Sequence, residues 1–167
     1  MIALEVDARI ALSLASPKPR DAQRQARQAV ELSPHPYVAY QTQLVLAEAL
    51  LRAGSADQAL VAINRAYVHS RAAARALGAE LHDPGLQALA ISLEAQALLD
   101  SHRDLAHGLI RSALTDPALQ GFHAGVAIDF VTCLERKALA LPAWFQVDAH
   151  GLLRLADQLR LQHKLVY

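Results

Sequence analysis

The strongest constraint on the fold of this chain is the recurrence of small and apolar residues between Tyr40 and Tyr67. Steps of three and four positions place such residues on one side of an α-helix. Gly54 interrupts the run and can adopt the left-handed conformation that ends a helix, and Ser55 can cap the helix that follows. The stretch therefore predicts a helical hairpin. Its apolar positions are Leu44, Leu46, Ala47, Leu50 and Leu51 before the turn, and Ala59, Ala62, Ile63 and Ala66 after it.

This pattern resembles the signature of the tetratricopeptide repeat. The matching residues are Leu46, Ala47, Leu50, Gly54, Ala59, Ile63 and Ala66, and Gln43 stands where the family prefers Trp. The resemblance implies antiparallel hairpins that stack side by side. We therefore expect an all-α fold, a right-handed stack of about four antiparallel helical hairpins forming a tetratricopeptide-like solenoid. We expect residues 1–167 to make up this single domain.

Seven prolines lie between the periodic runs and mark the expected helix boundaries. The expected helices are 2–15, 21–32, the two helices of the hairpin with the second running on to Gly78, 84–100, 102–114, one following Gly121, and 148–163. The hairpin expected over 84–114 follows the hairpin over 40–67 at a longer interval than the period of the standard repeat. Lengthened hairpins of this kind resemble the helical-repeat regions of bacterial LuxR-type and MalT-like transcriptional regulators. That resemblance allows either a freestanding module or a fragment of a larger regulator, with a role in transcription regulation.

Charge and cysteine content exclude several classes of partner. The 16 basic and 16 acidic residues cancel, so no basic face indicates nucleic-acid binding by this segment. The lone Cys133 cannot form an internal disulfide, and acidic Glu5 and Asp7 near the start do not fit a signal peptide. No apolar run reaches the roughly 20 residues of a membrane-spanning helix. We expect a cytoplasmic protein that does not contact membranes.

Motifs that carry enzymatic chemistry are missing from the sequence. It contains no P-loop, no dinucleotide-binding glycine motif, no nucleophile elbow and no HExxH zinc motif. Asp100, Asp104 and His107 have the spacing of one helix face, but two carboxylates and one imidazole from a single helix rarely hold a metal. An exposed polar face is the simpler interpretation. We expect no catalytic residue, no cofactor and no metal.

Two further features have an ordinary structural interpretation. Cys133 lies in an apolar helical run, where a thiol acts as a small hydrophobic group and its pKa tends upward, so we do not expect a nucleophile. Trp144 and Phe145 lie together in the expected linker 141–148. We prefer a buried aromatic cluster that seals the core to an exposed binding anchor.

The tetratricopeptide resemblance also implies a binding groove, because the first helices of successive hairpins line a concave surface in that family. The residues at the corresponding positions are Gln41, Leu44, Val45, Glu48, Leu51 and Arg52, followed by Ala88, Ile91, Ser92 and Leu98. A mostly apolar lining favours a peptide, a helix of another protein or a second copy of the chain. We therefore predict a non-catalytic protein- or peptide-binding module. The alternatives are a structural or homodimerisation segment without a separate ligand, and an all-helical enzyme with an unrecognised site.

Overall fold

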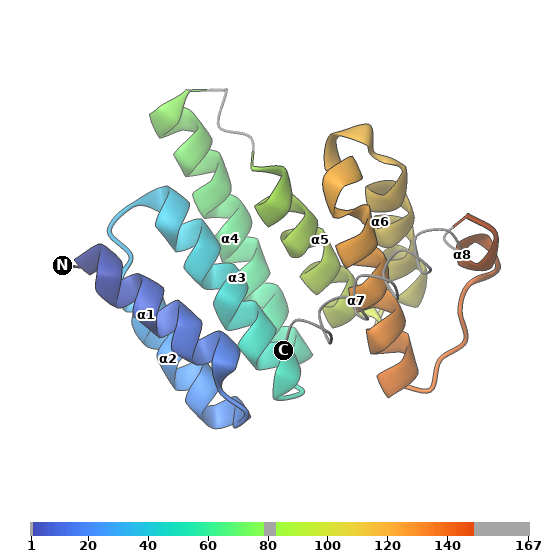
Figure 1. Cartoon of the computed structure of the whole chain (residues 1–167), viewed down its shortest axis with the longest axis horizontal. Helices are drawn as coiled ribbons and strands as arrows, with labels where there is room; N and C mark the ends of the chain where they lie inside the picture. Colours follow the sequence, from blue (N-terminus) through green and yellow to red (C-terminus); the bar gives the residue numbers. More distant parts are fainter. Residues whose placement is uncertain (1, 79–82, 149–167) are drawn as a thin grey trace, which may run out of the picture. The chain divides into compact units, whose positions relative to one another are not determined.

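The computed structural model describes residues 2–78 and 83–148, and every regular element in these two ranges is helical (Figure 1). The elements are α1 Ile2–Ala15, α2 Pro19–Leu32, α3 Pro36–Arg52, α4 Ala56–Leu77, α5 Pro84–Leu98, α6 Arg103–Thr115, the 3-10 helix η1 Pro117–Phe122, α7 His123–Arg136 and α8 Ala143–Asp148. The predicted all-α class is confirmed for this part of the chain. The helix expected over 148–163 lies, after its first residue, outside the described residues.

The chain divides into two compact units, Met1–Leu86 and Gln87–Tyr167. Prolines begin helices in both. Pro19 and Pro36 occupy the first turns of α2 and α3, and Pro117 begins η1. A proline there costs nothing, since the first N–H groups of a helix have no intrahelical acceptor. This explains why α2 begins at Pro19, two residues before the predicted start at Asp21.

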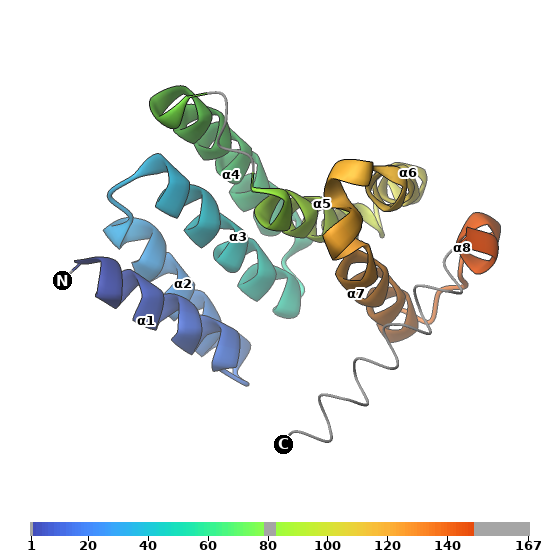
Figure 2. The ribbon, with the colours of Figure 1, turned by 45° about the horizontal axis from the view of Figure 1, so that its top comes forward.

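Consecutive helices of the first unit run antiparallel (Figure 2). The Ser13 hydroxyl of α1 donates to the Ala22 carbonyl of α2 at 2.8 Å, and the Ser33 and Thr42 hydroxyls, which join the end of α2 to α3, are also 2.8 Å apart. α1 contacts α3 as well as α2, and α3 packs most extensively against α4. Small residues line these contacts and let the helix backbones approach closely; they include Ala22, Ala26, Ala29, Ala59, Ala62 and Ala66, all buried.

The turn between α3 and α4 ends α3 as the sequence predicts. Gly54 has a φ of +78°, the Gly54 N–H donates to the Leu51 carbonyl at 3.0 Å, and the Ser55 N–H donates to the Leu50 carbonyl at 2.9 Å. This pair of bonds is the Schellman motif. The predicted capping role of the Ser55 side chain is wrong, because that side chain makes no capping hydrogen bond. The predicted extension of α4 to Gly78 is confirmed, since the helix ends at Leu77.

In the second unit, α6 contacts α7, and η1 contacts both. Lys137, just after α7, forms an ion pair with Asp100, just after α5, with 2.5 Å between Nζ and Oδ2. The segment expected as a plain linker contains the short helix α8. This helix places Phe145 5.4 Å from Phe130 of α7, measured between ring centroids, and both rings are buried. Aromatic burial therefore orders a segment whose sequence shows no helical period.

Candidate protein-interaction surface

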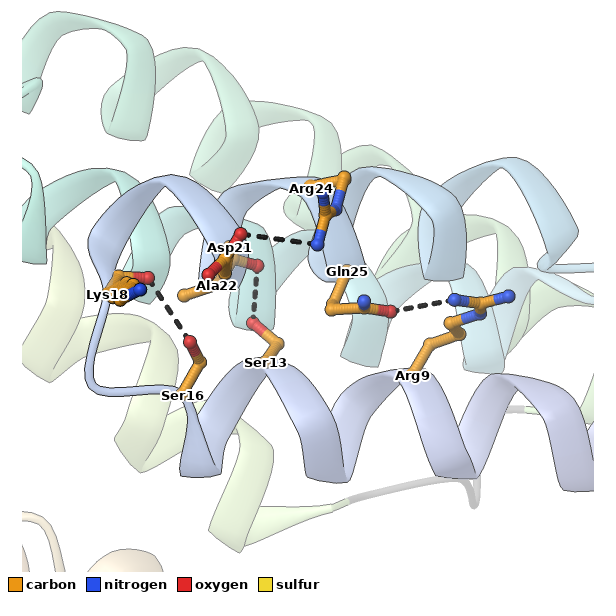
Figure 3. A network of polar contacts seen from close by, with 8 residues as sticks. All are labelled: Arg9, Ser13, Ser16, Lys18, Asp21, Ala22, Arg24 and Gln25. Atoms are coloured by element: carbon orange, nitrogen blue, oxygen red, sulfur yellow. Dashed lines mark hydrogen bonds and ion pairs between the residues drawn. The ribbon is translucent and has the colours of Figure 1, made fainter.

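The Arg9 and Ser13 side chains of α1 point toward α2 (Figure 3). The Arg9 guanidinium donates to the Gln25 side-chain oxygen at 2.9 Å, and the Ser13 hydroxyl, fully buried, donates to the Ala22 carbonyl. Val6 and Ile10 share this inner side and are buried with them. Ser13 thus binds the neighbouring helix, and Arg9 binds both that helix and Glu5 of α1, with which it forms an ion pair at 3.4 Å.

Arg52 holds the carboxyl end of α1. This residue ends α3, and its guanidinium donates to the Ser13 carbonyl at 3.3 Å and to the Ser16 carbonyl. The last carbonyl groups of a helix have no intrahelical donor and carry the negative end of its dipole, so a guanidinium fork is a suitable partner. The position and rotation of α1 are therefore fixed from two sides, by α2 and by Arg52.

The outer face of α1 is apolar and exposed. The exposed apolar residues of the helix are Ile2, Ala3, Leu4, Ala8, Ala11, Leu12, Leu14 and Ala15. Leu4 keeps 75% of its surface and Leu12 53%. Glu5 and Asp7 are the only charged residues among the exposed positions of α1. A helix whose leucines point outward presents an apolar surface of the kind that marks protein contacts. We call Leu4, Ala8, Ala11, Leu12, Leu14 and Ala15, which lie opposite the buried Val6 and Ile10, the α1 outer face.

The predicted groove residues of α3 lie differently. Leu44 has no exposed surface and Val45 is buried, so both belong to the packed interior. Gln41, Glu48 and Leu51 are half-buried, and Arg52 is half-buried with its guanidinium bound to α1. In the second unit, Ile91 is half-buried, and Leu98, Ala88 and Ser92 are buried. The groove therefore stays a prediction. One of its predicted residues, Arg52, is already bound to the carboxyl end of α1.

Sequence reasoning missed the α1 outer face. A signal for it exists, because the segment IALEVDARIALSLA carries apolar residues on all sides and lacks the polar stripe of an ordinary surface helix. By contrast, Gln43 stands at the tryptophan position of the repeat signature and is buried, with its side-chain oxygen unpaired within the described structure. The family pattern does not account for that residue.

Within residues 2–78 and 83–148, the acidic and histidine side chains show no convergence on a metal. No group of three such residues in the described ranges has the geometry of a metal site. The idea that Asp100 shares a helix face with Asp104 and His107 is wrong, because α6 begins at Arg103 and Asp100 lies before it. Asp100 is instead bound to Lys137.

His107 belongs to an aromatic cluster in the second unit. Its ring meets the Phe130 ring edge-on, with 5.7 Å between centroids, and Phe130 stacks with Trp144 at 6.4 Å. Burial lowers the pKa of His107, the nearby Asp104 carboxylate raises it, and Arg103 lowers it further. The Nε2 atom is buried without a hydrogen-bond partner among the described residues. The predicted buried aromatic cluster is thus present, with Phe145 fully buried and Trp144 half-buried.

The pKa values of the Cys133 thiol and of the Tyr37 and Tyr40 phenols are all raised above their ordinary values. Burial raises the pKa of Cys133, and the weaker opposing effects of Lys137 and Arg136 do not reverse the shift. Burial, assisted by the Asp83 carboxylate, raises the pKa of Tyr40 to about 12. The Tyr37 hydroxyl donates a hydrogen bond to the Asp83 carboxylate at 2.7 Å, and this bond raises the pKa of Tyr37 as well. All three groups stay protonated at neutral pH.

None of the helices in the described ranges has both the length and the apolar character that crossing a bilayer requires. Comparison of the chain with protein-family models, with curated proteins and with solved structures gave no match.

Proposed function

We propose that this chain is a non-catalytic helical module that binds another protein chain, and that the α1 outer face takes part in the contact. The observation that carries the proposal is the exposure of Leu4 and Leu12 on a helix whose Arg9 and Ser13 side chains face the neighbouring helix. Removing exposed apolar surface from water favours association, so several leucines on one face favour a partner.

The rigidity of α1 supports the same proposal. Ser13 ties it to α2, and Arg52 ties its carboxyl end to α3. A surface that is fixed before binding loses less conformational freedom on association than a mobile one. The contact of α1 with α3, in addition to α2, also suits the stacked hairpins of a tetratricopeptide-like solenoid.

The test compares charge substitutions at matched exposed positions. Wild-type protein, Leu12→Glu and Val68→Glu would be used as baits in extracts of the source cell, since Leu12 and Val68 are 53% and 57% exposed on different helices. We expect one set of proteins to be captured by the wild type and by Val68→Glu and to be lost with Leu12→Glu. Normal helicity by circular dichroism excludes unfolding. Equal capture by all three baits would contradict the proposal.

A further inference from the structure

We infer that the α1 outer face binds the α1 outer face of a second copy of the chain, with the two helices antiparallel about a two-fold axis. The inference rests on the proposed function and names the partner. Leu4, Ala8, Ala11 and Ala15 lie along the centre of this face, at intervals that are the same when read from either end. Such a row can pair with itself by rotation, which is what an isologous interface requires.

The sizes of the side chains fit this pairing. When the axis passes between Ala8 and Ala11, Leu4 of one copy lies opposite Ala15 of the other, and Ala8 lies opposite Ala11. Leu4, the largest side chain of the row, therefore meets the small Ala15 at each end of the contact. Small residues meet at the centre, where the two backbones are closest. Leu12 and Leu14 flank the row on its two sides and are buried by the same contact.

The charges select the antiparallel direction. Exposed Glu5 and Asp7 lie in the first half of α1, whereas exposed Lys18 and Arg20 follow its carboxyl end. An antiparallel pair brings the acidic half of each helix toward the basic turn of the other. A parallel pair sets acidic residues against acidic residues and basic against basic, which is unfavourable.

The expected dimer is weak. A single helix face is smaller than the roughly 800 Å² that each partner buries in a standard stable complex. We therefore expect a monomer–dimer equilibrium that shifts with protein concentration, weakened moderately by salt because the charged residues lie at the rim.

Sedimentation velocity over a concentration series tests the inference on the full chain. Wild type and Val68→Glu should dimerise alike, and Leu4→Glu should weaken the dimer more than about tenfold, because symmetry places the charge in the contact twice. Ala11→Leu should also weaken it, by crowding the centre where Ala8 and Ala11 meet. Each variant would be checked for normal helicity. A wild-type monomer at every concentration, or a dimer indifferent to Leu4→Glu, overturns the inference.

Disulfide cross-linking tests the direction. Under mild oxidation, Leu4→Cys protein mixed with Ala15→Cys protein should form a cross-linked dimer, and Leu4→Cys protein alone should form little. The native Cys133 is buried and serves in both samples as the same background. Efficient self-cross-linking of Leu4→Cys overturns the antiparallel arrangement. A strictly monomeric chain that still captures a protein through Leu12 would refute the second copy as partner and leave the proposed function standing.

Discussion

Gly54 and Ala138 occupy the same position in two helix ends with the same hydrogen-bond pattern. Each follows the last residues of a helix, with a φ of +78° at Gly54 and +53° at Ala138. After α7, the Ala138 N–H donates to the Glu135 carbonyl at 3.1 Å and the Leu139 N–H to the Leu134 carbonyl at 2.9 Å, which repeats the bonds at the end of α3. The same Schellman motif is thus built once with glycine and once with alanine.

The glycine version gives the first prediction. Gly54→Ala should lower the free energy of unfolding by about 1 kcal/mol, because an L-residue is strained in the left-handed region. Nothing lies within 4 Å of a Cβ added at Gly54, so the cost comes from the backbone alone and not from a clash. Urea denaturation measures the change. A loss several times larger would show that the turn is packed more tightly than the structure has it.

The alanine version predicts the opposite sign. Ala138→Gly relieves the left-handed strain of roughly 1–2 kcal/mol and is opposed by the greater backbone entropy that glycine has in the unfolded chain. The net gain should be up to about 1 kcal/mol. Ala140→Gly, two residues farther on, serves as the control and should give no gain. A destabilised Ala138→Gly variant would contradict the helix end described for α7.

Arg52 provides a prediction about α1. Arg52→Ala should destabilise the protein by roughly 1–3 kcal/mol, because the Ser13 and Ser16 carbonyls lose a charged donor. Arg65→Ala, at an exposed position of α4, should cost less than about 0.5 kcal/mol. Amide hydrogen exchange locates the effect. Exchange should accelerate in α1 for Arg52→Ala, whereas faster exchange in α3 alone would mean that Arg52 serves only its own helix.

Ala59 tests the close packing of α3 against α4. Ala59→Leu should cost roughly 1–3 kcal/mol, since the side chain at this position is fully buried and added volume forces the helices apart. The same substitution at Ala76, exposed near the end of α4, is the matched control and should be close to neutral. If both variants kept the wild-type denaturation midpoint, Ala59 would not lie in the contact.

His107 predicts how the second unit responds to acid. Burial holds its pKa below the value of about 6.5 expected in the unfolded chain, so the folded state favours neutral imidazole. Its contribution to stability is therefore complete above pH ~6.5 and is lost as the pH falls through that value toward the lower folded pKa. The fluorescence of Trp144, the single tryptophan, reports the cluster. His107→Gln should remove this part of the acid response, and an unchanged pH profile would contradict it.

The sequence predicts the local features of this fold well, because they depend on neighbours along the chain. Gly54 breaks the apolar run, and Pro36 and Pro84 stand at the beginnings of helices, so these boundaries follow from backbone chemistry. Ala138 was not predicted as a helix end, since alanine carries no preference for the left-handed region. The contact of Phe145 with Phe130 orders α8 through a partner in another helix, which no local pattern reveals.

The site was harder to predict, because exposure depends on which helices pack together. Leu44 belongs to the same apolar run as Leu50, and only the packing of α3 shows that both are interior. The partnership of Arg52 with α1 joins residues 36 or more positions apart in the chain. The outer leucines of α1 look in sequence like core residues. The hydrogen bonds of Arg9 and Ser13 to α2 show which side of α1 faces inward, and so place these leucines on the surface.

Site-specific photo-cross-linking tests the central claim most directly, that the α1 outer face is where this chain contacts another protein chain. A photoreactive amino acid would replace Leu12 or, as the matched control, Val68, and the full protein would be irradiated in the source cell. The account predicts cross-links from position 12, to a second copy or to another protein, and few from position 68. Cross-links from neither position, or equally from both, would contradict it.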